Sequence, residues 1–465
     1  MTNTRVGRHP PPDSGAGRPK VGAFIYGLPG RKDDPIWRGN RISQENGDSS
    51  AFMEGMKKTV LLIATFDTKE DEALFLKKRI EARGVSVLTM DAGILAPPCV
   101  QVDSNQQQGA LRGGAPLQEI VATGDKGKCI LNMIRGAEII CKELYAQGRF
   151  QGVIGMGGAQ GTDIGCSAMR SLPVGVPRLM VSTVASGRAT FGPYVGTKDI
   201  AMMHSVADIQ GLNFVTKRIL ENAAGAICGM VEGFEGSSLN PEGIPVALSM
   251  LGTTTPGALR CKKTLEDRGF EVVTFHQNGT GGIAMEDMIL EGAFQGVMDL
   301  NLHEIGDRFA GGLHGAIRDD RLEAAGALGI PQVVAPGSIN YAVWGPLGSL
   351  SKELKSRKYI VHNPNLTLVR LSPDELVSVG KLTAQKLNRG KGPIRVFIPL
   401  RGFSYPDRTN LPHWEPEGNR AFIDAFKANL NPTIPVIELD AHINDPEFID
   451  PVTDAFLLMM GRQKS

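Results

Sequence analysis

Apolar runs and amphipathic segments alternate along most of the chain. Residues 60–64, VLLIA, are all apolar, which is typical of a strand covered on both faces. Residues 71–83 then place apolar side chains close to helical spacing, and Gly84 ends this predicted helix. Residues 85–90 predict a second strand. Strands that alternate with helices in this way favour a parallel sheet.

This layout occurs twice. Residues 61–90 match residues 246–275 at an offset of 185. Two shorter landmarks recur in the same order: FQGV at 150–153 and 294–297, and GVP at 175–177 as GIP at 329–331. We therefore predict two tandem Rossmann-like α/β domains with mainly parallel sheets and a ligand cleft between them. A doubly wound sheet is favoured over a single eightfold barrel because the repeat is twofold.

The predicted domain boundaries follow from composition. Residues 1–56 are rich in Pro, Gly and charge without a sustained period, so we expect an N-terminal extension that is disordered or dispensable. We assign residues 57–238 to the first domain and residues 243–465 to the second, with a linker at 240–243. Residues 96–128 form an irregular excursion rich in Gln and Gly, which we interpret as a lid or an interface loop.

The remaining pattern predicts further strands and helices. Those of the first domain are helix 132–147, strand 152–156, helix 161–170, strand 178–182 and a mostly helical segment at 200–235. Those of the second are strands 245–250, 271–275, 296–300 and 332–335, and helices 256–268, 285–292 and 321–328. A tail absent from the first domain adds strand 394–399, helix 419–429, strand 436–439 and helix 446–460.

Composition narrows the function classes. Lys plus Arg (50) and Asp plus Glu (49) nearly balance, so no basic excess indicates nucleic acid or an anionic membrane surface. No apolar run approaches the roughly 18 residues of a membrane span, and no signal-peptide layout opens the chain. The six cysteines form no CxxC pair, which suits buried thiols in a reducing compartment. We expect a cytoplasmic protein.

Polar residues that follow the predicted strands are the candidates for chemistry, because open parallel sheets bind ligands at the carboxyl ends of their strands. The first such turn carries Asp67, Thr68 and Lys69 at a helix start. Thr68 and Lys69 could hold phosphate oxygens, whereas a well-capped helix explains the same residues without a ligand. The matching turn of the second domain, with Thr253 and Thr254, lacks acidic residues and predicts the better anion cradle.

A glycine-rich turn follows the central strand of the first domain, at Gly157, Gly158, Gln160, Gly161 and Thr162. Backbone amides of such a turn can converge on a phosphate at a helix N-terminus. The turn is neither a strict GxGxxG nor a Walker A loop, and glycines that serve only tight packing are the alternative.

Two further turns complete the predicted binding set. Thr183, Ser186 and Gly187 follow the next strand, which would lie beside the glycine turn in a parallel sheet. Asn278 and Gly279 occupy a glycine-rich turn of the second domain. We predict that these residues contact the same ligand.

The sequence HEIGD at residues 303–307 resembles a zinc-protease HExxH, but Asp307 replaces the second histidine. Nearby glycines argue against the helix that a metalloprotease needs, so we disfavour that class. His303, Glu304 and Asp307 could bind magnesium, take part in acid/base chemistry or cap a helix.

Five segments resemble those of the Tm-one-like ATP-binding family: LLIATFDTKEDE, VIGMGGAQGTDIG, MVSTVASG, SMLGTTTPGA and HQNGTGG. The resemblance extends over about residues 57–462. The family is named for the inhibitory N-terminal region of a plant protein that confers resistance to tomato mosaic virus. It implies two Rossmann-like domains, binding of ATP with magnesium, and self-association as a homodimer. We transfer no antiviral role from the plant member.

We therefore expect an ATP-binding protein whose phosphates lie on the Gly157–Thr162 turn and the hydroxyls of Thr183 and Ser186. The second domain would close over the nucleotide with Thr253, Thr254 and Asn278. The alternative is an ATP- or phosphometabolite-dependent enzyme that uses Glu304 and Asp307 with magnesium and Lys69 as an electrostatic stabiliser. A regulatory scaffold whose ATP site stiffens an interface is the third possibility.

Overall fold

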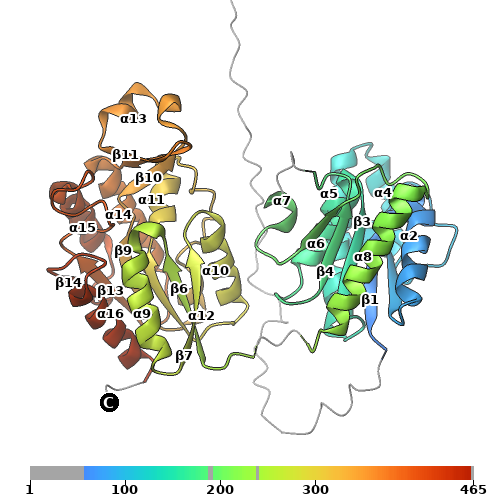
Figure 1. Ribbon diagram of the computed structural model, residues 1–465, viewed down its shortest axis with the longest axis horizontal. Helices are drawn as coiled ribbons and strands as arrows, with labels where there is room; N and C mark the ends of the chain where they lie inside the picture. The colour runs from blue at the N-terminus through green and yellow to red at the C-terminus, as the bar shows by residue number, and fades with distance from the viewer. Residues whose placement is uncertain (1–56, 187–191, 237–239, 462–465) are drawn as a thin grey trace, which may run out of the picture. The chain divides into compact units, whose positions relative to one another are not determined.

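The computed structural model describes residues 57–186, 192–236 and 240–461 (Figure 1). The predicted extension at residues 1–56 and the candidate Gly187 lie outside the described residues. Among the described helices, none combines the length and apolar character that crossing a bilayer requires.

The N-terminal domain is built on a five-stranded parallel sheet with the order β2-β1-β3-β4-β5. Its strands are β1 (Thr59–Ala64), β2 (Ser86–Asp91), β3 (Gly152–Gly157), β4 (Arg178–Ser182) and β5 (Ala201–His204). Val60 and Leu62 of β1 face one core and Leu61 and Ile63 face the other, because successive side chains of a strand point to opposite faces. The sheet is therefore covered on both faces.

Helices on each face supply these two cores. The first is formed with α2 (Phe66–Glu81) and α8 (Phe214–Glu232), which lie over the same face of the sheet (Figure 1). The second is formed with α3 (Gln106–Gly113), α4 (Leu117–Ala122), α5 (Lys126–Ala146) and α6 (Ala159–Arg170), and the short α7 (Gly192–Val195) packs against it.

The C-terminal domain repeats this plan in a six-stranded parallel sheet with the order β14-β13-β9-β8-β6-β7. Its strands are β6 (Ile244–Met250), β7 (Phe270–His276), β8 (Gly296–Asn301), β9 (Gln332–Gly337), β13 (Ile394–Pro399) and β14 (Val436–Leu439). The order β7-β6-β8-β9 reproduces β2-β1-β3-β4, which confirms the prediction of two related α/β units.

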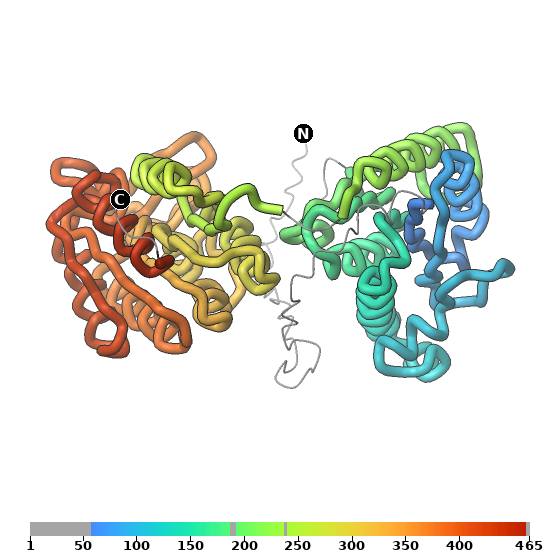
Figure 2. Tube along the Cα trace, turned by 90° about the horizontal axis from the view of Figure 1, so that it is seen from below, coloured from blue at the N-terminus to red at the C-terminus, as the bar shows by residue number. Residues whose placement is uncertain are grey.

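The helices of the C-terminal domain also lie on both faces of its sheet. One face is covered by α9 (Thr255–Glu266) and α16 (Pro446–Met459), which pack side by side although they are far apart in the sequence (Figure 2). The other face is covered by α10 (Thr280–Leu290), α11 (His303–Ala310), α12 (Ala324–Leu328), α14 (Pro373–Leu387) and α15 (Pro416–Asn429).

A small antiparallel sheet, which the sequence did not predict, follows β9. Its order is β10-β12-β11, with β10 (Tyr341–Trp344), β11 (Tyr359–Asn363), β12 (Leu366–Arg370) and the short α13 (Lys352–Ser356). Its three strands are only four or five residues long, and β11 is mostly exposed, so none of the three has a sustained apolar period.

Three other segments differ from the predictions. The segment 200–235 begins with strand β5 and not with helix, and the HEIGD sequence lies on helix α11 despite the glycines nearby. The excursion at 96–128 contains α3 and α4. Helix α3 packs directly on α5, and the two backbones are so close that a Cβ on Gly136 would lie 1.8 Å from the Gly109 carbonyl oxygen. Glycine at position 136 thus allows the close approach of α3 to α5.

The cysteines are nearly all buried, as the sequence predicted. Five lie in the cores and form no disulfide, and burial raises the pKa of the Cys141, Cys166 and Cys261 thiols to about 12. Cys99, in the loop after β2, is exposed.

Candidate functional site

A pocket of about 590 Å³ lies in the N-terminal domain at the carboxyl ends of β1 and β3. Predicted site residues that line it are Asp67, Thr68, Lys69, Gly158, Gln160 and Gly161. The other lining residues are Thr65, Ile94, Leu95, Val121, Gly124, Lys126, Cys129 and Ala159. The structure therefore brings together two turns that the sequence separates by about 90 positions.

The N-terminus of α6 forms one wall of this pocket. Gly158 occupies the N-cap position and offers no side-chain acceptor. Within the described chain, no acceptor meets the backbone N–H groups of Ala159, Gln160 and Gly161, whereas Thr162 N–H donates to the Gly158 carbonyl at 2.8 Å. Three unsatisfied N–H groups and the positive end of the helix dipole together favour an anion here.

The glycines of this turn have different roles. A Cβ on Gly157 would lie 2.8 Å from Gly161 Cα, so α6 could not start this close to β3 with a larger residue. A Cβ on Gly158 would meet only Thr183 Oγ1, at 3.7 Å, so the space above Gly158 is open. Gly157 serves packing, and Gly158 leaves room for a ligand.

Behind the turn, hydroxyl groups hold it in place. Thr162 is fully buried; its Oγ1 donates to the Gly158 carbonyl at 2.8 Å and lies 2.6 Å from Ser182 Oγ. Thr183 is half-buried beside Gly158, and its N–H donates to the Gly157 carbonyl at 3.2 Å. Ser186 is also half-buried and does not line the pocket. Thr162 therefore positions the turn instead of facing a ligand.

The acidic residues of the turn after β1 are tied down by backbone N–H groups. Asp67 Oδ2 accepts from Ile94 N–H at 2.9 Å and Leu95 N–H at 3.0 Å, and Glu70 Oε2 accepts from Cys99 N–H at 2.6 Å. These bonds hold the loop after β2 against the turn and offset part of the carboxylate charge.

Two lysines add positive charge to the pocket. Lys69 has a non-helical backbone, with φ −136° and ψ 27°, where α2 kinks. Lys126 begins α5, at the end of the excursion. Neither ammonium group forms an ion pair with any described residue.

The outer wall is apolar, and sequence reasoning missed it. Leu95 is 74% exposed and Val121 is 45% exposed, and both line the pocket together with Ile94 and Cys129. The signal in the sequence was the position of the excursion at 96–128, which contains Val121 and is flanked by Leu95 and Cys129. An insertion between a strand end and the next helix lies where open sheets bind ligands.

The equivalent edge of the C-terminal domain is filled by its own side chains. Thr253 Oγ1 lies 2.6 Å from Ser338 Oγ and 2.9 Å from the Tyr341 hydroxyl. Thr254 is 2% exposed, and its Oγ1 accepts from Asn301 Nδ2 at 2.9 Å. Both predicted hydroxyls thus have protein partners.

Glu304 is buried in a charged cluster. Its Oε1 accepts from the N–H groups of Gly279 at 2.7 Å and Gly282 at 3.1 Å, and its Oε2 lies 3.3 Å from Arg321 Nε. Arg321 also pairs with Asp299 at 2.7 Å and Glu286 at 3.1 Å. Burial raises the pKa of Glu286 to about 7. Glu304 pins the loop after β7, on which Asn278 is exposed.

Asp307 pins a second loop. Its Oδ1 accepts from Val343 N–H at 2.5 Å, and a Cβ on Gly312 would lie 2.5 Å from its Oδ2. Burial raises the pKa of Asp307 to about 6. In the part of the chain that the structure describes, no three His, Cys, Asp or Glu side chains converge as a metal site.

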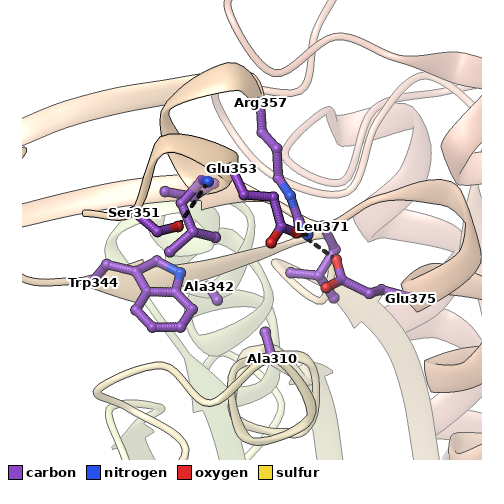
Figure 3. Close-up of a pocket in the computed structure, with 10 residues that line it drawn as sticks. Ala310, Ala342, Trp344, Ser351, Glu353, Arg357, Leu371 and Glu375 are labelled. Atoms are coloured by element: carbon purple, nitrogen blue, oxygen red, sulfur yellow. Dashed lines mark hydrogen bonds and ion pairs between the residues drawn. The ribbon is translucent and has the colours of Figure 1, made fainter.

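A smaller pocket of about 230 Å³ lies under the antiparallel sheet (Figure 3). Trp344 and Arg357 line it, and Arg357 bonds Glu375 at 2.7 Å and Glu353 at 2.8 Å. Its cation is therefore already paired with protein carboxylates.

Fold and site define a protein with two tandem doubly wound α/β domains, of which the first carries an open pocket at its strand ends. The sequence profile described as "Uncharacterised protein family (UPF0261) N-terminal domain" matches residues 58–236, and the corresponding C-terminal domain profile matches residues 244–460. The chain belongs to the UPF0261 family.

Two sequence relatives agree with this assignment. A UPF0261 protein of Clostridium tetani is 37% identical over 88% of this chain and 100% of its own length. The ToMV resistance protein Tm-1(GCR237) of Solanum lycopersicum is 32% identical over 86% of this chain and 55% of its own length. Among solved structures, the Streptomyces glycosyltransferase SsfS6 shares 14% identity over 60% of this chain and 82% of its own, with a TM-score of 0.15.

Proposed function

We propose that the N-terminal domain binds ATP at the pocket between the turn after β1 and the start of α6. The observation that carries the proposal is one pocket of about 590 Å³ that joins an uncapped helix N-terminus, two unpaired ammonium groups and an apolar wall. This volume is within the usual range for small-molecule sites.

The phosphate end would lie on the N–H groups of Ala159, Gln160 and Gly161. These donors are fixed before binding, so their alignment costs little when an anion arrives. Lys69 and Lys126 would add charge-assisted contacts to the outer phosphates.

The base end would lie on Ile94, Leu95 and Val121. In the ligand-free domain Leu95 and Val121 are exposed to water. A planar base that covered them would bury apolar surface, which favours binding. The polar and apolar ends of the pocket thus match the two ends of a nucleotide.

Magnesium would arrive with the phosphates. Magnesium is commonly bound by substrate phosphate oxygens and water, with few protein carboxylates. This mode of binding is consistent with the described residues, in which no three His, Cys, Asp or Glu side chains form a metal site. Bound there, it would neutralise phosphate charge. Self-association as a homodimer, which the family resemblance implies, is a separate proposal that light scattering tests.

Thermal unfolding with and without ATP and magnesium tests the binding proposal. A ligand at about 100 times its dissociation constant adds roughly 2.7 kcal/mol to the free energy of unfolding. Gly158→Asp places a carboxylate in the open space above the turn, so we expect this gain to vanish while the ligand-free transition shifts little.

Gly252→Asp is the matched control. Gly252 also follows a strand, and a Cβ there meets no atom within 4 Å. This variant should keep the full response to ATP. An undiminished response of Gly158→Asp would place the phosphates elsewhere.

A further inference from the structure

The pocket under the antiparallel sheet combines an aromatic side with a charged side. Figure 3 shows the indole of Trp344 on one side and the charged groups on the other, from Glu353, Arg357 and Glu375. Trp344 is half-buried at the end of β10. The volume of about 230 Å³ is below the roughly 300–1,000 Å³ of sites for drug-sized ligands. The pocket therefore suits a small organic molecule.

Glu375, in the first turn of α14, is held by two donors that both use the same carboxylate oxygen. Its Oε2 accepts from Ser372 N–H at 2.8 Å, as part of the capping box of α14, and from Arg357 Nη1 at 2.7 Å. Within the described part of the chain, no hydrogen bond ends on its Oε1. This oxygen can accept from a ligand while Oε2 keeps the side chain in place, so binding requires little rearrangement of the protein.

The charges of the residues that line the pocket do not cancel. Arg357 also donates through Nη2 to Glu353 at 2.8 Å, so one guanidinium group serves two carboxylates. Glu353 is 76% exposed, and an exposed ion pair within one helix contributes little stability. The carboxylate of Glu353 is therefore available to a ligand, and the lining residues leave one negative charge, which favours a cation.

A ligand carboxylate is the competing occupant, since it could take the place of Glu353 on Arg357. Glu375 opposes this arrangement, because its carboxylate is fixed beside the guanidinium group and would repel a second anion. The indole of Trp344 also favours a cation, because the face of an aromatic ring carries partial negative charge.

We propose that this pocket binds a small primary amine in its protonated form, with an apolar body attached to the ammonium group. The ammonium group donates to Glu375 Oε1 and to Glu353, and its three hydrogens allow it to serve both carboxylates. The apolar body covers Trp344 and Ala342, which also lines the pocket. The site lies within the C-terminal domain and does not depend on nucleotide binding.

Fluorine-19 NMR of full-length protein labelled with 5-fluorotryptophan tests the ligand class at pH 7.5, with Trp344→Phe used to assign the Trp344 signal. Three probes share a phenylethyl body: phenethylamine is a cation, 2-phenylethanol is neutral and 3-phenylpropanoate is an anion. We expect phenethylamine to shift the Trp344 signal in a saturable way and to bind about tenfold more tightly than the other two, because only the amine forms charge-assisted hydrogen bonds with the carboxylates. No saturable shift with phenethylamine, or equal or tighter binding of either other probe, would overturn the proposal.

A variant of Glu375 tests the ammonium contact. Glu375→Gln removes the charge but keeps an oxygen for Ser372 N–H, since capping boxes accept Gln at this position. We expect phenethylamine to bind roughly five- to tenfold more weakly to this variant, while the affinity for 2-phenylethanol stays the same.

Asp374→Asn is the matched control. Asp374 lies in the same first turn of α14 and does not line the pocket, so this variant loses the same charge and should bind phenethylamine as the native protein does. Equal weakening in both variants would assign the effect to the general surface charge. That result, or an unchanged affinity in Glu375→Gln, would refute the proposed contact.

Discussion

The strand ends of the two domains differ although their sheets share a strand order. In the N-terminal domain, the start of α6 leaves three N–H groups unsatisfied and open space above Gly158. In the C-terminal domain, Thr253 and Thr254 at the corresponding edge have buried partners, and Glu304 takes the N–H groups of Gly279 and Gly282. A repeated scaffold can thus keep its topology while one copy leaves its backbone donors available and the other satisfies them internally.

The largest expected effect is on folding of the C-terminal domain. Arg321→Met leaves Glu286, Asp299 and Glu304 buried without their cation, so we expect a loss of about 3–5 kcal/mol in the free energy of unfolding. Urea titration followed by tryptophan fluorescence measures it, since Trp344 and Trp414 lie in this domain. Arg178→Met in the N-terminal domain is the control, because its partner Asp199 is 46% exposed. This variant should not shift the unfolding transition of the C-terminal domain. A loss below about 1 kcal/mol for Arg321→Met would contradict the expectation.

The same cluster predicts a pH dependence. The folded-state pKa of Glu286 is raised from 4.5 to about 7, so the unfolded chain releases this proton first as pH rises. Its contribution to stability is therefore greatest below pH 4.5 and falls until about pH 7, by on the order of 3 kcal/mol. Glu286→Gln should remove this part of the slope in urea titrations from pH 5 to pH 8. An unchanged slope would assign the proton to another group.

In the open pocket, Lys69→Met should weaken ATP binding. Losing one charge-assisted contact to phosphate costs about 1.5–3 kcal/mol, or roughly 10- to 150-fold in affinity by titration calorimetry. Lys77→Met on the same helix is the control, because Lys77 pairs with Glu81 outside the pocket. Equal affinities for the two variants would remove Lys69 from the site.

The smallest expected effect tests whether the C-terminal domain contributes to ATP binding. Thr254→Val removes a hydroxyl that accepts from Asn301, so we expect about 1–2 kcal/mol lower stability and unchanged ATP affinity. If ATP affinity falls at least tenfold instead, both domains share the ligand, as the tandem repeat first suggested.

Periodicity and the internal repeat predicted the parallel strands except β5, because strands such as β1 and β6 are buried on both faces and have nearly continuous apolar sequences, whereas β5 is partly exposed. The same two signals did not predict α3, because its sequence QQQGALRG has little apolar content. This helix packs against α5 at Gly109. Ala110 is the buried apolar residue of this helix, and the Asn132 side chain donates to the Ala110 carbonyl at 2.8 Å. The close approach of the Gly109 and Gly136 backbones leaves no periodic side-chain pattern in the sequence.

Only part of the candidate site could be predicted from the sequence, because some of its residues are brought together by tertiary contacts alone. Gly158, Gln160 and Lys69 adjoin strand ends, and the rule for parallel sheets located them. Val121 and Lys126 reach the pocket through the tertiary placement of the excursion, and Leu95 reaches it from the loop just before the excursion. Glu304 acquires its role from the N–H groups of Gly279 and Gly282, which precede it in the sequence by 25 and 22 positions.

The exposed Cys99 gives the native protein a built-in attachment point for a spectroscopic probe. Cys99 lies in the loop that also carries Leu95, and its N–H donates to Glu70 of α2. The other five thiols are buried. A maleimide dye should therefore label this loop without removal of any cysteine. Its emission would report events at the pocket rim on the native sequence.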